Sequence, residues 1–253
     1  MGTVLFALWC FLVAAGGGLV GLVLGNIRLP ATLLVASSAA AGTGANLVIS
    51  AAAAGTASIA HLRAGRVNWR LFAWMAPPSV AGAVLGGYLS GVIPRTALLL
   101  VISAVLLYSG LDLMRWTPPR RSAGGAGDTA GDRLDVRAAV TSGALIGLLG
   151  GIVGLILGSL RMPALLRLVG EAPARAAGTN VTVGFCVGIA GALGHLPSTA
   201  PDWRVAAIGS AASIPGALAG ARLTGRLSEQ ALVRAIAVVL LVAGTATAVQ
   251  AVA

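Results

Sequence analysis

The sequence predicts an all-α polytopic integral membrane protein built as a tandem repeat. Three observations lead to this fold class. Of the 253 residues, 57% are hydrophobic and only 9% are charged, the mean hydropathy is +0.94, and one glycine-rich stretch occurs twice. A soluble domain carries roughly a quarter charged residues. We therefore expect a multi-pass protein of the cytoplasmic cell membrane, surrounded by a lipid bilayer.

The intervals between charged residues give the candidate membrane segments. Uncharged stretches of about 20 residues are long enough to cross a bilayer as helices. The first stretch is not interpreted as a signal peptide, because no basic residue precedes it and its second half recurs later in the chain. The eight expected segments are Gly2–Ile27, Leu29–His61, Leu71–Ile93, Thr96–Leu111, Ala138–Leu160, Ala176–Pro201, Val205–Ala221 and Ala235–Ala253.

The repeat divides the chain into two halves of about four hydrophobic segments each. "GGLVGLVLGNIRLP" begins at Gly17 and "GGIVGLILGSLRMP" begins at Gly150. The similarity continues along both halves, which we place at 1–116 and 135–253. The linker at 117–134 is rich in proline, glycine and charge, a composition typical of a solvated connection. We expect this linker to be cytoplasmic.

The distribution of arginine predicts that the two halves are inverted. If the glycine-rich first segment of each half is re-entrant, entering and leaving on one face, the arginines divide fourteen to three between the two sides. Making the second segment re-entrant instead divides them twelve to five. The positive-inside rule favours such an excess on the cytoplasmic side. Both alternatives give inverted halves, and they leave the identity of the re-entrant segment open.

The formal charge of +10 comes from seventeen basic residues against seven acids. In a soluble protein this balance would indicate a nucleic-acid partner. Here the arginines stand in short loops between apolar segments, where the positive-inside rule accounts for them. No nucleic-acid partner is therefore expected.

A proline two residues after each repeated arginine indicates where an anion could bind. Arg28 precedes Pro30 and Arg161 precedes Pro163, and each proline is expected to open the next helix, because proline is tolerated in a first helical turn. The free N–H groups of a helix N-terminus favour an anion. Arg28 and Arg161 could add a charged, forked contact to an oxyanion. They could equally be interfacial anchors that extend towards lipid headgroups.

Polar residues in the middle of two segments supply the other candidate ligands. "AGTGAN" and "AAGTNVT" are expected to interrupt their helices in the membrane, and matched interruptions point to a transport site. The candidates are Thr43 and Asn46 in the first half and Thr179 and Asn180 in the second. The alternative is that these side chains only form hydrogen bonds between helices.

No motif in the sequence indicates an enzyme. The sequence contains no GxSxG, HExxH, Walker A or paired-cysteine motif, and no acidic residue lies well inside an apolar segment. We therefore expect no catalytic residues, no metal site and no cofactor, and no carboxylate of the kind that cation pumps use. His61 and His195 stand at segment ends, where an interfacial position is the simpler interpretation and proton transfer the alternative.

The ordered motifs resemble the TauE/SafE family of sulfite and organosulfonate exporters. They are the two glycine-rich stretches ending in Arg-x-Pro, the Gly-Thr pairs at 42–43 and 178–179, and "NWR" and "DWR" at 68 and 202, each followed by a Gly-Ala-x-x-Gly helix. The resemblance covers essentially the whole chain. It implies a permease for small sulfur-containing anions such as sulfite, sulfoacetate or related sulfonates.

Our leading hypothesis is export of such an anion as the small-molecule partner. A monovalent anion that leaves a negative interior gains about 2.3 kcal/mol per 100 mV, so a facilitator without a coupling ion would suffice. One competing hypothesis is proton-coupled anion uptake. The other is a non-transporting membrane scaffold that packs against a partner subunit. The sequence is compatible with a homo-oligomer.

Overall fold

The computed structural model describes residues 2–89, 95–115, 136–153, 157–195 and 200–252. Within these ranges the chain is helical and contains no strand, which confirms the all-α prediction. The helices are α1 (Gly2–Val20), α2 (Gly25–Val35), α3 (Ala39–Arg63), α4 (Trp69–Tyr88), α5 (Arg95–Met114), α6 (Val136–Val153), α7 (Gly158–Arg167), α8 (Pro173–His195), α9 (Trp203–Thr224) and α10 (Glu229–Val252).

The lengths of the helices and their apolar surfaces are those of a polytopic membrane protein. Helices α1, α3, α5 and α10 are long and apolar enough to cross a bilayer. Large hydrophobic side chains remain exposed on their surfaces, including Val4 at 75% and Tyr108 at 74%. Water would disfavour such a contiguous apolar surface, whereas lipid does not. The hydrophobic surface is therefore the face that the protein presents to the bilayer.

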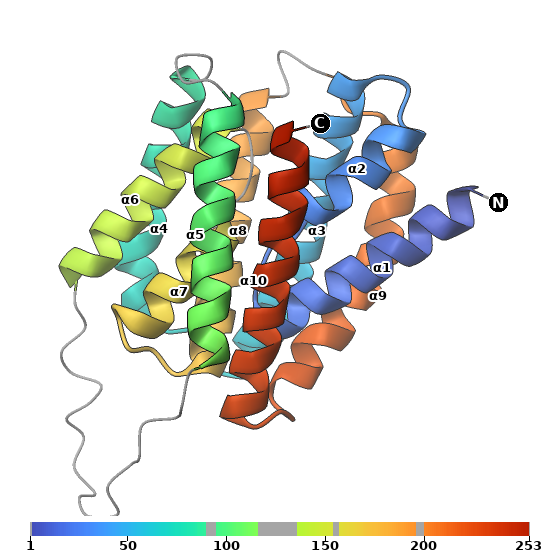
Figure 1. The fold of residues 1–253 in the computed structure, drawn as a ribbon. Helices are drawn as coiled ribbons and strands as arrows, with labels where there is room; N and C mark the ends of the chain where they lie inside the picture. The colour runs from blue at the N-terminus through green and yellow to red at the C-terminus, as the bar shows by residue number, and fades with distance from the viewer. Residues whose placement is uncertain (1, 90–94, 116–135, 154–156, 196–199, 253) are drawn as a thin grey trace, which may run out of the picture.

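Each half begins with a broken helix that turns back on itself. In Figure 1, α1 runs downwards from the N-terminus and α2 returns upwards, whereas α6 rises from the linker and α7 returns downwards. The turn after α1 is made at Gly21, whose φ is +68°. The Leu22 N–H donates to the carbonyl of Gly17 at 2.8 Å, as at a helix end closed by a left-handed glycine.

These breaks correct the expected helix boundaries. Arg28 and Arg161 are not in loops: they lie within α2 and α7, as do Pro30 and Pro163. The interruption predicted within "AGTGAN" and "AAGTNVT" is also wrong, because α3 and α8 are continuous there. Hydropathy could not locate the break between α1 and α2, because Leu22, Val23 and Leu24 are as hydrophobic as the helices that they separate.

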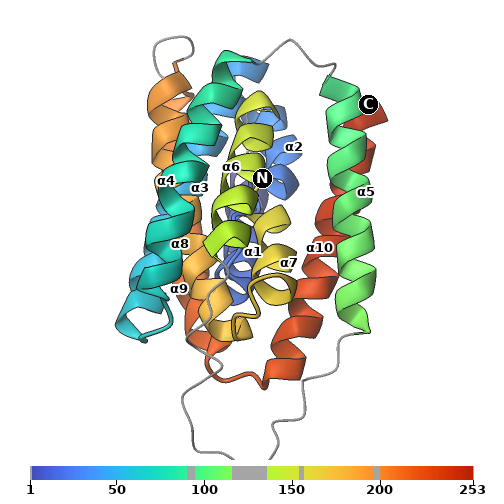
Figure 2. The same ribbon diagram turned by 90° about the vertical axis from the view of Figure 1, so that its left-hand side faces the viewer.

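The two halves interlock instead of forming separate bodies. The broken helix of each half packs on the other half, α1 against α9 and α6 against α4, and α5 packs along α10. Figures 1 and 2 show that α5 and α10 are neighbours that run in opposite directions. The last long helices of the two halves therefore lie side by side and point in opposite directions.

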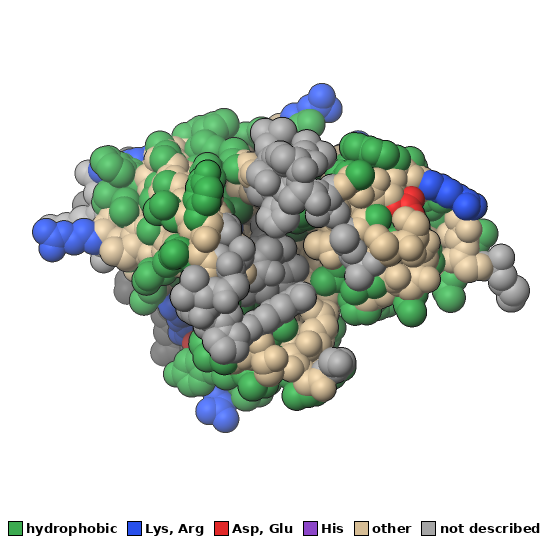
Figure 3. All heavy atoms as spheres, turned by 90° about the horizontal axis from the view of Figure 1, so that it is seen from above, with side chains coloured by type: hydrophobic (Ala, Val, Ile, Leu, Met, Phe, Trp, Pro, Cys, Tyr) green, Lys and Arg blue, Asp and Glu red, His purple; other side chains and the backbone are tan. Residues whose placement is uncertain are grey.

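The two ends of the molecule differ in charge. The α3–α4, α7–α8 and α9–α10 connections lie at the end where α5 ends and α6 begins, here called the linker end, and the C-terminus lies at the opposite end. These three connections and the helix ends beside them carry most of the described arginines, Arg63, Arg66, Arg70, Arg167, Arg175, Arg222, Arg226 and Arg234. Figure 3, which views the opposite end, shows mainly hydrophobic and uncharged side chains. The predicted linker at 117–134 lies outside the described residues.

A matched polar residue begins α4 and α9 and ties each to the other half. Asn68 Oδ1 accepts from the Leu71 N–H at 3.1 Å, and Asp202 Oδ1 accepts from the Val205 N–H at 3.1 Å. Asn68 Nδ2 also donates to Glu171 Oε2 at 2.5 Å. These N-caps are the "NWR" and "DWR" motifs, and they lie at the linker end and the opposite end respectively.

Candidate functional site

The two helix breaks meet in the middle of the molecule. Asn180 of α8 joins them, because its Nδ2 donates to the carbonyl of Gly21 at 2.8 Å and to that of Gly158 at 3.0 Å. A Cβ added to Gly158 would lie 3.7 Å from the backbone nitrogen of Val23. Backbone that leaves helical geometry at membrane depth is tolerated where protein or water surrounds it. The breaks therefore form a shared central site.

The N-termini of α2 and α7 begin at this centre. Their N-cap residues are Leu24 and Leu157, and neither helix start receives a hydrogen bond from a side-chain cap. A leucine side chain has no oxygen with which to accept from the N–H groups of the first turn. Two helix N-termini thus direct positive partial charge towards the breaks.

Arg28 is held in the interior by polar groups of α3. Its side chain is buried, with 2% of the residue exposed. Its Nε donates to Asn46 Oδ1 at 3.0 Å, and its Nη2 donates to the Asn46 carbonyl at 3.2 Å and to Ser50 Oγ at 2.5 Å. Asn46 in turn donates from Nδ2 to the carbonyl of Gly25 at 3.1 Å. Asn46 therefore fixes both the start of α2 and its arginine.

Arg161, in the matching position of α7, has a different environment. The residue is fully buried, at 0% exposed. Its Nε and Nη1 have no hydrogen-bond partner in the structure, and neither has Asn180 Oδ1. Buried polar groups are nearly always paired, and a buried charge is costly unless it is paired. Unpaired buried donors on a cation are the feature expected of a place where an anion binds.

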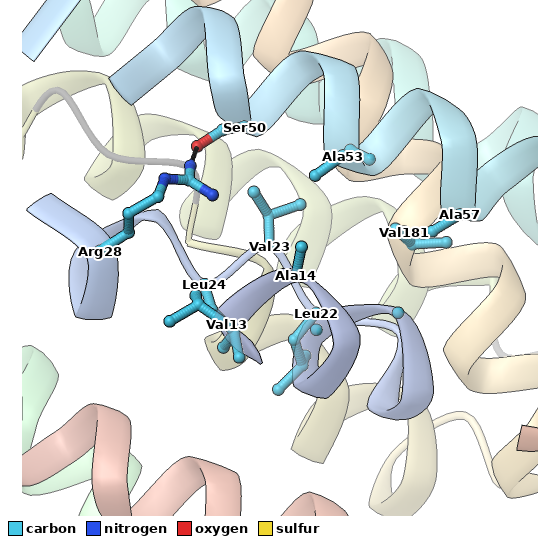
Figure 4. Close-up of a pocket in the computed structure, with 13 residues that line it drawn as sticks. Val13, Ala14, Leu22, Val23, Leu24, Arg28, Ser50, Ala53, Ala57 and Val181 are labelled. Carbon is cyan, nitrogen blue, oxygen red and sulfur yellow. Dashed lines mark hydrogen bonds between the residues drawn. The ribbon is translucent and has the colours of Figure 1, made fainter. Parts of the chain in front are cut away.

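A narrow cavity lies beside the first break (Figure 4). Its polar lining consists of Arg28 and Ser50, towards which the Arg28 guanidinium points, and the rest is mainly apolar side chains of α1, the break and α3. It reaches α8 at Val181, the residue after Asn180. Only about 10 Å³ is open to the centre of a water molecule, which is room for about one water. The site is therefore nearly closed in this conformation.

The predicted site residues divide into two groups. Arg28 and Asn46 lie together at the first break, and Asn180 lies at the point where both breaks meet. Thr179 is buried, but its Oγ1 accepts from the backbone N–H of Asn68 at 2.9 Å, so its hydroxyl is engaged at the start of α4. Thr43 is half-buried and lies one turn before Asn46.

His61 is not the interfacial residue that the sequence suggested. It is completely buried, and its Nε2 lies 3.1 Å from the carbonyl of Gly18. A carbonyl only accepts, so Nε2 carries the proton, and Nδ1 is an unprotonated acceptor without a partner. The side chain of His195 lies outside the described residues. Among the described residues, no cluster of three His, Cys, Asp or Glu side chains could hold a metal ion.

Ser50 and Gly21 shape the first break and its arginine, and they were not among the sequence candidates. Ser50 lies in the middle of an alanine-rich helix, and the signal that could have found it is its spacing of four residues from Asn46, which places both on one face. Gly21 is one of 36 glycines in the sequence. Its role at the break depends on a backbone conformation that composition does not show.

Paired discontinuous helices, with their N-termini converging at mid-depth between two matching halves, are the architecture of a membrane transporter. The chain matches the family model described as sulfite exporter TauE/SafE over residues 6–247. It therefore belongs to this family of membrane transporters for sulfur-containing anions such as sulfite. Searches of the curated proteins and of the solved structures gave no significant match.

Proposed function

We propose that the protein exports sulfite or a small organosulfonate such as sulfoacetate across the cytoplasmic membrane, with the anion bound where the two helix breaks meet. The observation that carries this proposal is the fully buried Arg161 with two unpartnered donors. Removing water from a cation costs several kcal/mol, and an anionic partner offsets much of that cost. An oxyanion of sulfur offers several oxygens to such donors.

The surroundings of Arg161 support an anion over a cation or a neutral solute. The N-termini of α2 and α7 and the second buried arginine, Arg28, all add positive potential at the centre. Within the part of the chain that the structure describes, the side chains that donate to the carbonyls at the breaks are the amides of Asn46 and Asn180, which are neutral. The interior potential of a cell then drives the anion outwards by about 2.3 kcal/mol per charge per 100 mV.

The test is flux of labelled sulfite and sulfoacetate in proteoliposomes under an imposed voltage. Arg161→Gln keeps the length of the side chain but removes its charge. A hydrogen bond to a charged group contributes about 1.5–3 kcal/mol, so apparent affinity should fall about tenfold to a hundredfold. Arg137→Gln is the matched control, because Arg137 is an exposed arginine of α6. Its flux should equal that of the wild type.

Thr179→Val, Thr43→Val and Arg28→Gln complete the series. Arg28→Gln should lower flux because it removes positive charge beside the first break, and the two threonine changes should lower it because they alter the helix surface next to Asn46 and Asn180. If every variant inserts normally and transports with unchanged affinity and rate, the anion does not pass through this site. Absence of voltage-driven flux of any sulfur oxyanion by the wild type would support a scaffold instead.

Proton-coupled uptake is the second candidate function, and the observation that favours it is the unpartnered Nδ1 of the buried His61. An acceptor nitrogen without a partner is a place where a proton could bind. Under this alternative, a pH gradient without voltage drives sulfite uptake, and His61→Gln abolishes that dependence. Under export without coupling, His61→Gln leaves the voltage dependence unchanged and a pH gradient alone moves no sulfite.

A further inference from the structure

The two buried arginines occupy equivalent positions, each beside a matching asparagine–glycine hydrogen bond. In each half, an asparagine of the long helix donates from Nδ2 to the carbonyl of the glycine that starts the short helix: Asn46 to Gly25 at 3.1 Å and Asn180 to Gly158 at 3.0 Å. Arg28 and Arg161 each follow that glycine by three residues. Asn46 and Asn180 are therefore equivalent, and so are the two arginines.

One turn along the long helix, the two halves differ. The residue four positions after Asn46 is Ser50, and the residue four positions after Asn180 is Gly184. In a helix these positions share a face, so Gly184 occupies the place that corresponds to Ser50. Glycine has no side chain with which to accept a hydrogen bond.

This difference corresponds to a difference in the hydrogen bonding of the two guanidinium groups. Ser50 Oγ accepts from Arg28 Nη2 at 2.5 Å, and Asn46 accepts from Arg28 twice more. On the other side, Arg161 Nε and Nη1 and Asn180 Oδ1 are all without partners. The arginine with the serine is engaged by protein, whereas the arginine with the glycine is left with unpaired positive charge.

We infer that Arg161 alone binds the transported oxyanion directly, and that Ser50 makes Arg28 a structural clamp between α2 and α3. This inference rests on the proposed function and names which of the two matching arginines is the ligand. Asn180 Oδ1 can hold Arg161 through Nε as Asn46 holds Arg28, and Nη1 then remains for an oxygen of the anion. The protein accordingly binds a single small oxyanion per chain, at the second half.

The decisive variant is Gly184→Ser, which gives the second half the hydroxyl of the first. The affinity of this variant for sulfite is measured by calorimetry on detergent-solubilised protein. It should be at least about tenfold lower than that of the wild type, which corresponds to one hydrogen bond to a charged group. Its thermal unfolding midpoint should rise, because a buried donor gains a partner. Gly184→Ala adds the bulk of a Cβ without an acceptor and should bind sulfite within about threefold of the wild type.

Ser50→Ala keeps the inference testable if Gly184→Ser does not fold. It removes one acceptor from Arg28 and should lower the unfolding midpoint while sulfite still binds at a ratio of one per chain. Arg161→Gln should weaken that binding about tenfold to a hundredfold. The inference is overturned if Gly184→Ser binds sulfite like the wild type, if Gly184→Ala loses as much affinity as Gly184→Ser, or if Ser50→Ala and Arg161→Gln weaken binding equally.

These outcomes separate this inference from the proposed function. If the wild type neither binds nor moves sulfite or sulfoacetate, the proposed function fails, and the unfolding midpoints of Gly184→Ser and Ser50→Ala still report whether the serine position clamps its arginine. If the wild type transports and Gly184→Ser changes neither midpoint nor affinity, the function stands and the assignment to Arg161 alone is wrong.

Discussion

A guanidinium buried in an apolar interior determines which residues surround it. Around Arg28, the polar groups of α3 are Asn46 and Ser50, in a helix that is otherwise mostly alanine and other small or apolar residues. Hydrogen bonds recover only part of the cost of taking a charge out of water. Positive potential therefore remains at the centre even where the donors are paired.

At the same scale, Gly21 sets how closely the two halves approach. A Cβ at Gly21 would lie 2.2 Å from the carbonyl oxygen of Ala177 in α8, and the φ of +68° is one that side chains disfavour. We predict that Gly21→Ala strongly destabilises the protein, because the backbone of α8 would have to move. The measurement is the thermal unfolding midpoint in detergent, together with the yield of folded protein.

Gly65 provides the matched control for this prediction. It ends α3 with a φ of +66° and would have no atom within 4 Å of an added Cβ. Gly65→Ala therefore suffers only the backbone strain, about 1–2 kcal/mol. Equal losses in Gly21→Ala and Gly65→Ala would show that close packing against Ala177 contributes nothing.

At the scale of elements, the break between α1 and α2 shows what the sequence could and could not predict. The repeated glycine-rich stretch and its reversal were predictable, because glycine at fixed positions permits both a turn and close packing. The position of the turn was not. Hydropathy is uniform across Leu22–Leu24, and the arginine that follows looked like a loop residue because a charge usually marks the end of a membrane segment.

The candidate site was predictable in part for a related reason. Arg28, Arg161, Asn46 and Asn180 were found because polar residues stand out in apolar segments. Their pairing was not predictable, because it depends on which helix faces which. Ser50 was missed because a serine in an alanine-rich helix is common and gives no signal by itself.

The start of α9 carries a prediction about charge. Asp202 accepts from the N–H of Val205 and, through Oδ2, from the N–H of Ser37 at 3.1 Å. These two hydrogen bonds lower the pKa of Asp202 below its ordinary value of 3.8, and the bond from Val205 has the larger effect. Because the folded state favours the ionised form, its stabilisation is complete above pH 3.8 and is lost as the pH falls below that value.

We predict a graded series of unfolding midpoints at pH 7. Asp202→Asn keeps an oxygen for Val205 but gives up the second acceptor, so its midpoint should fall below that of the wild type. Asp202→Ala loses both bonds and should fall further. Differential scanning fluorimetry in detergent gives the order. A midpoint of Asp202→Asn equal to the wild type would show that the link to Ser37 adds no stability.

At the scale of the whole molecule, interlocking makes the halves depend on each other. Because α1 packs on α9 and α6 on α4, neither half can bury its broken helix alone. Asn180 also joins the two breaks, because it donates to the carbonyls of both Gly21 and Gly158. In transporters built from repeats, alternating access comes from movement of one repeat against the other around a fixed site, and this link lies where the two halves meet.

The orientation of the molecule in the membrane gives the last prediction. The described arginines gather at the linker end, and with Arg28 and Arg161 inside the protein, few remain at the opposite end. The positive-inside rule then places the linker end in the cytoplasm and both termini outside.

Single cysteines are introduced at Thr3, Ser122 and Val252 in a background with Cys10 and Cys186 changed to alanine, and intact cells are treated with a membrane-impermeant maleimide. Thr3→Cys and Val252→Cys should react in intact cells, whereas Ser122→Cys should react only after permeabilisation. Ser228→Cys, in the α9–α10 connection, is the control and should behave like Ser122→Cys, because Figure 1 places that connection at the linker end. Reaction of Ser122→Cys together with the termini in intact cells would contradict this orientation, because an impermeant reagent would then reach the linker from outside.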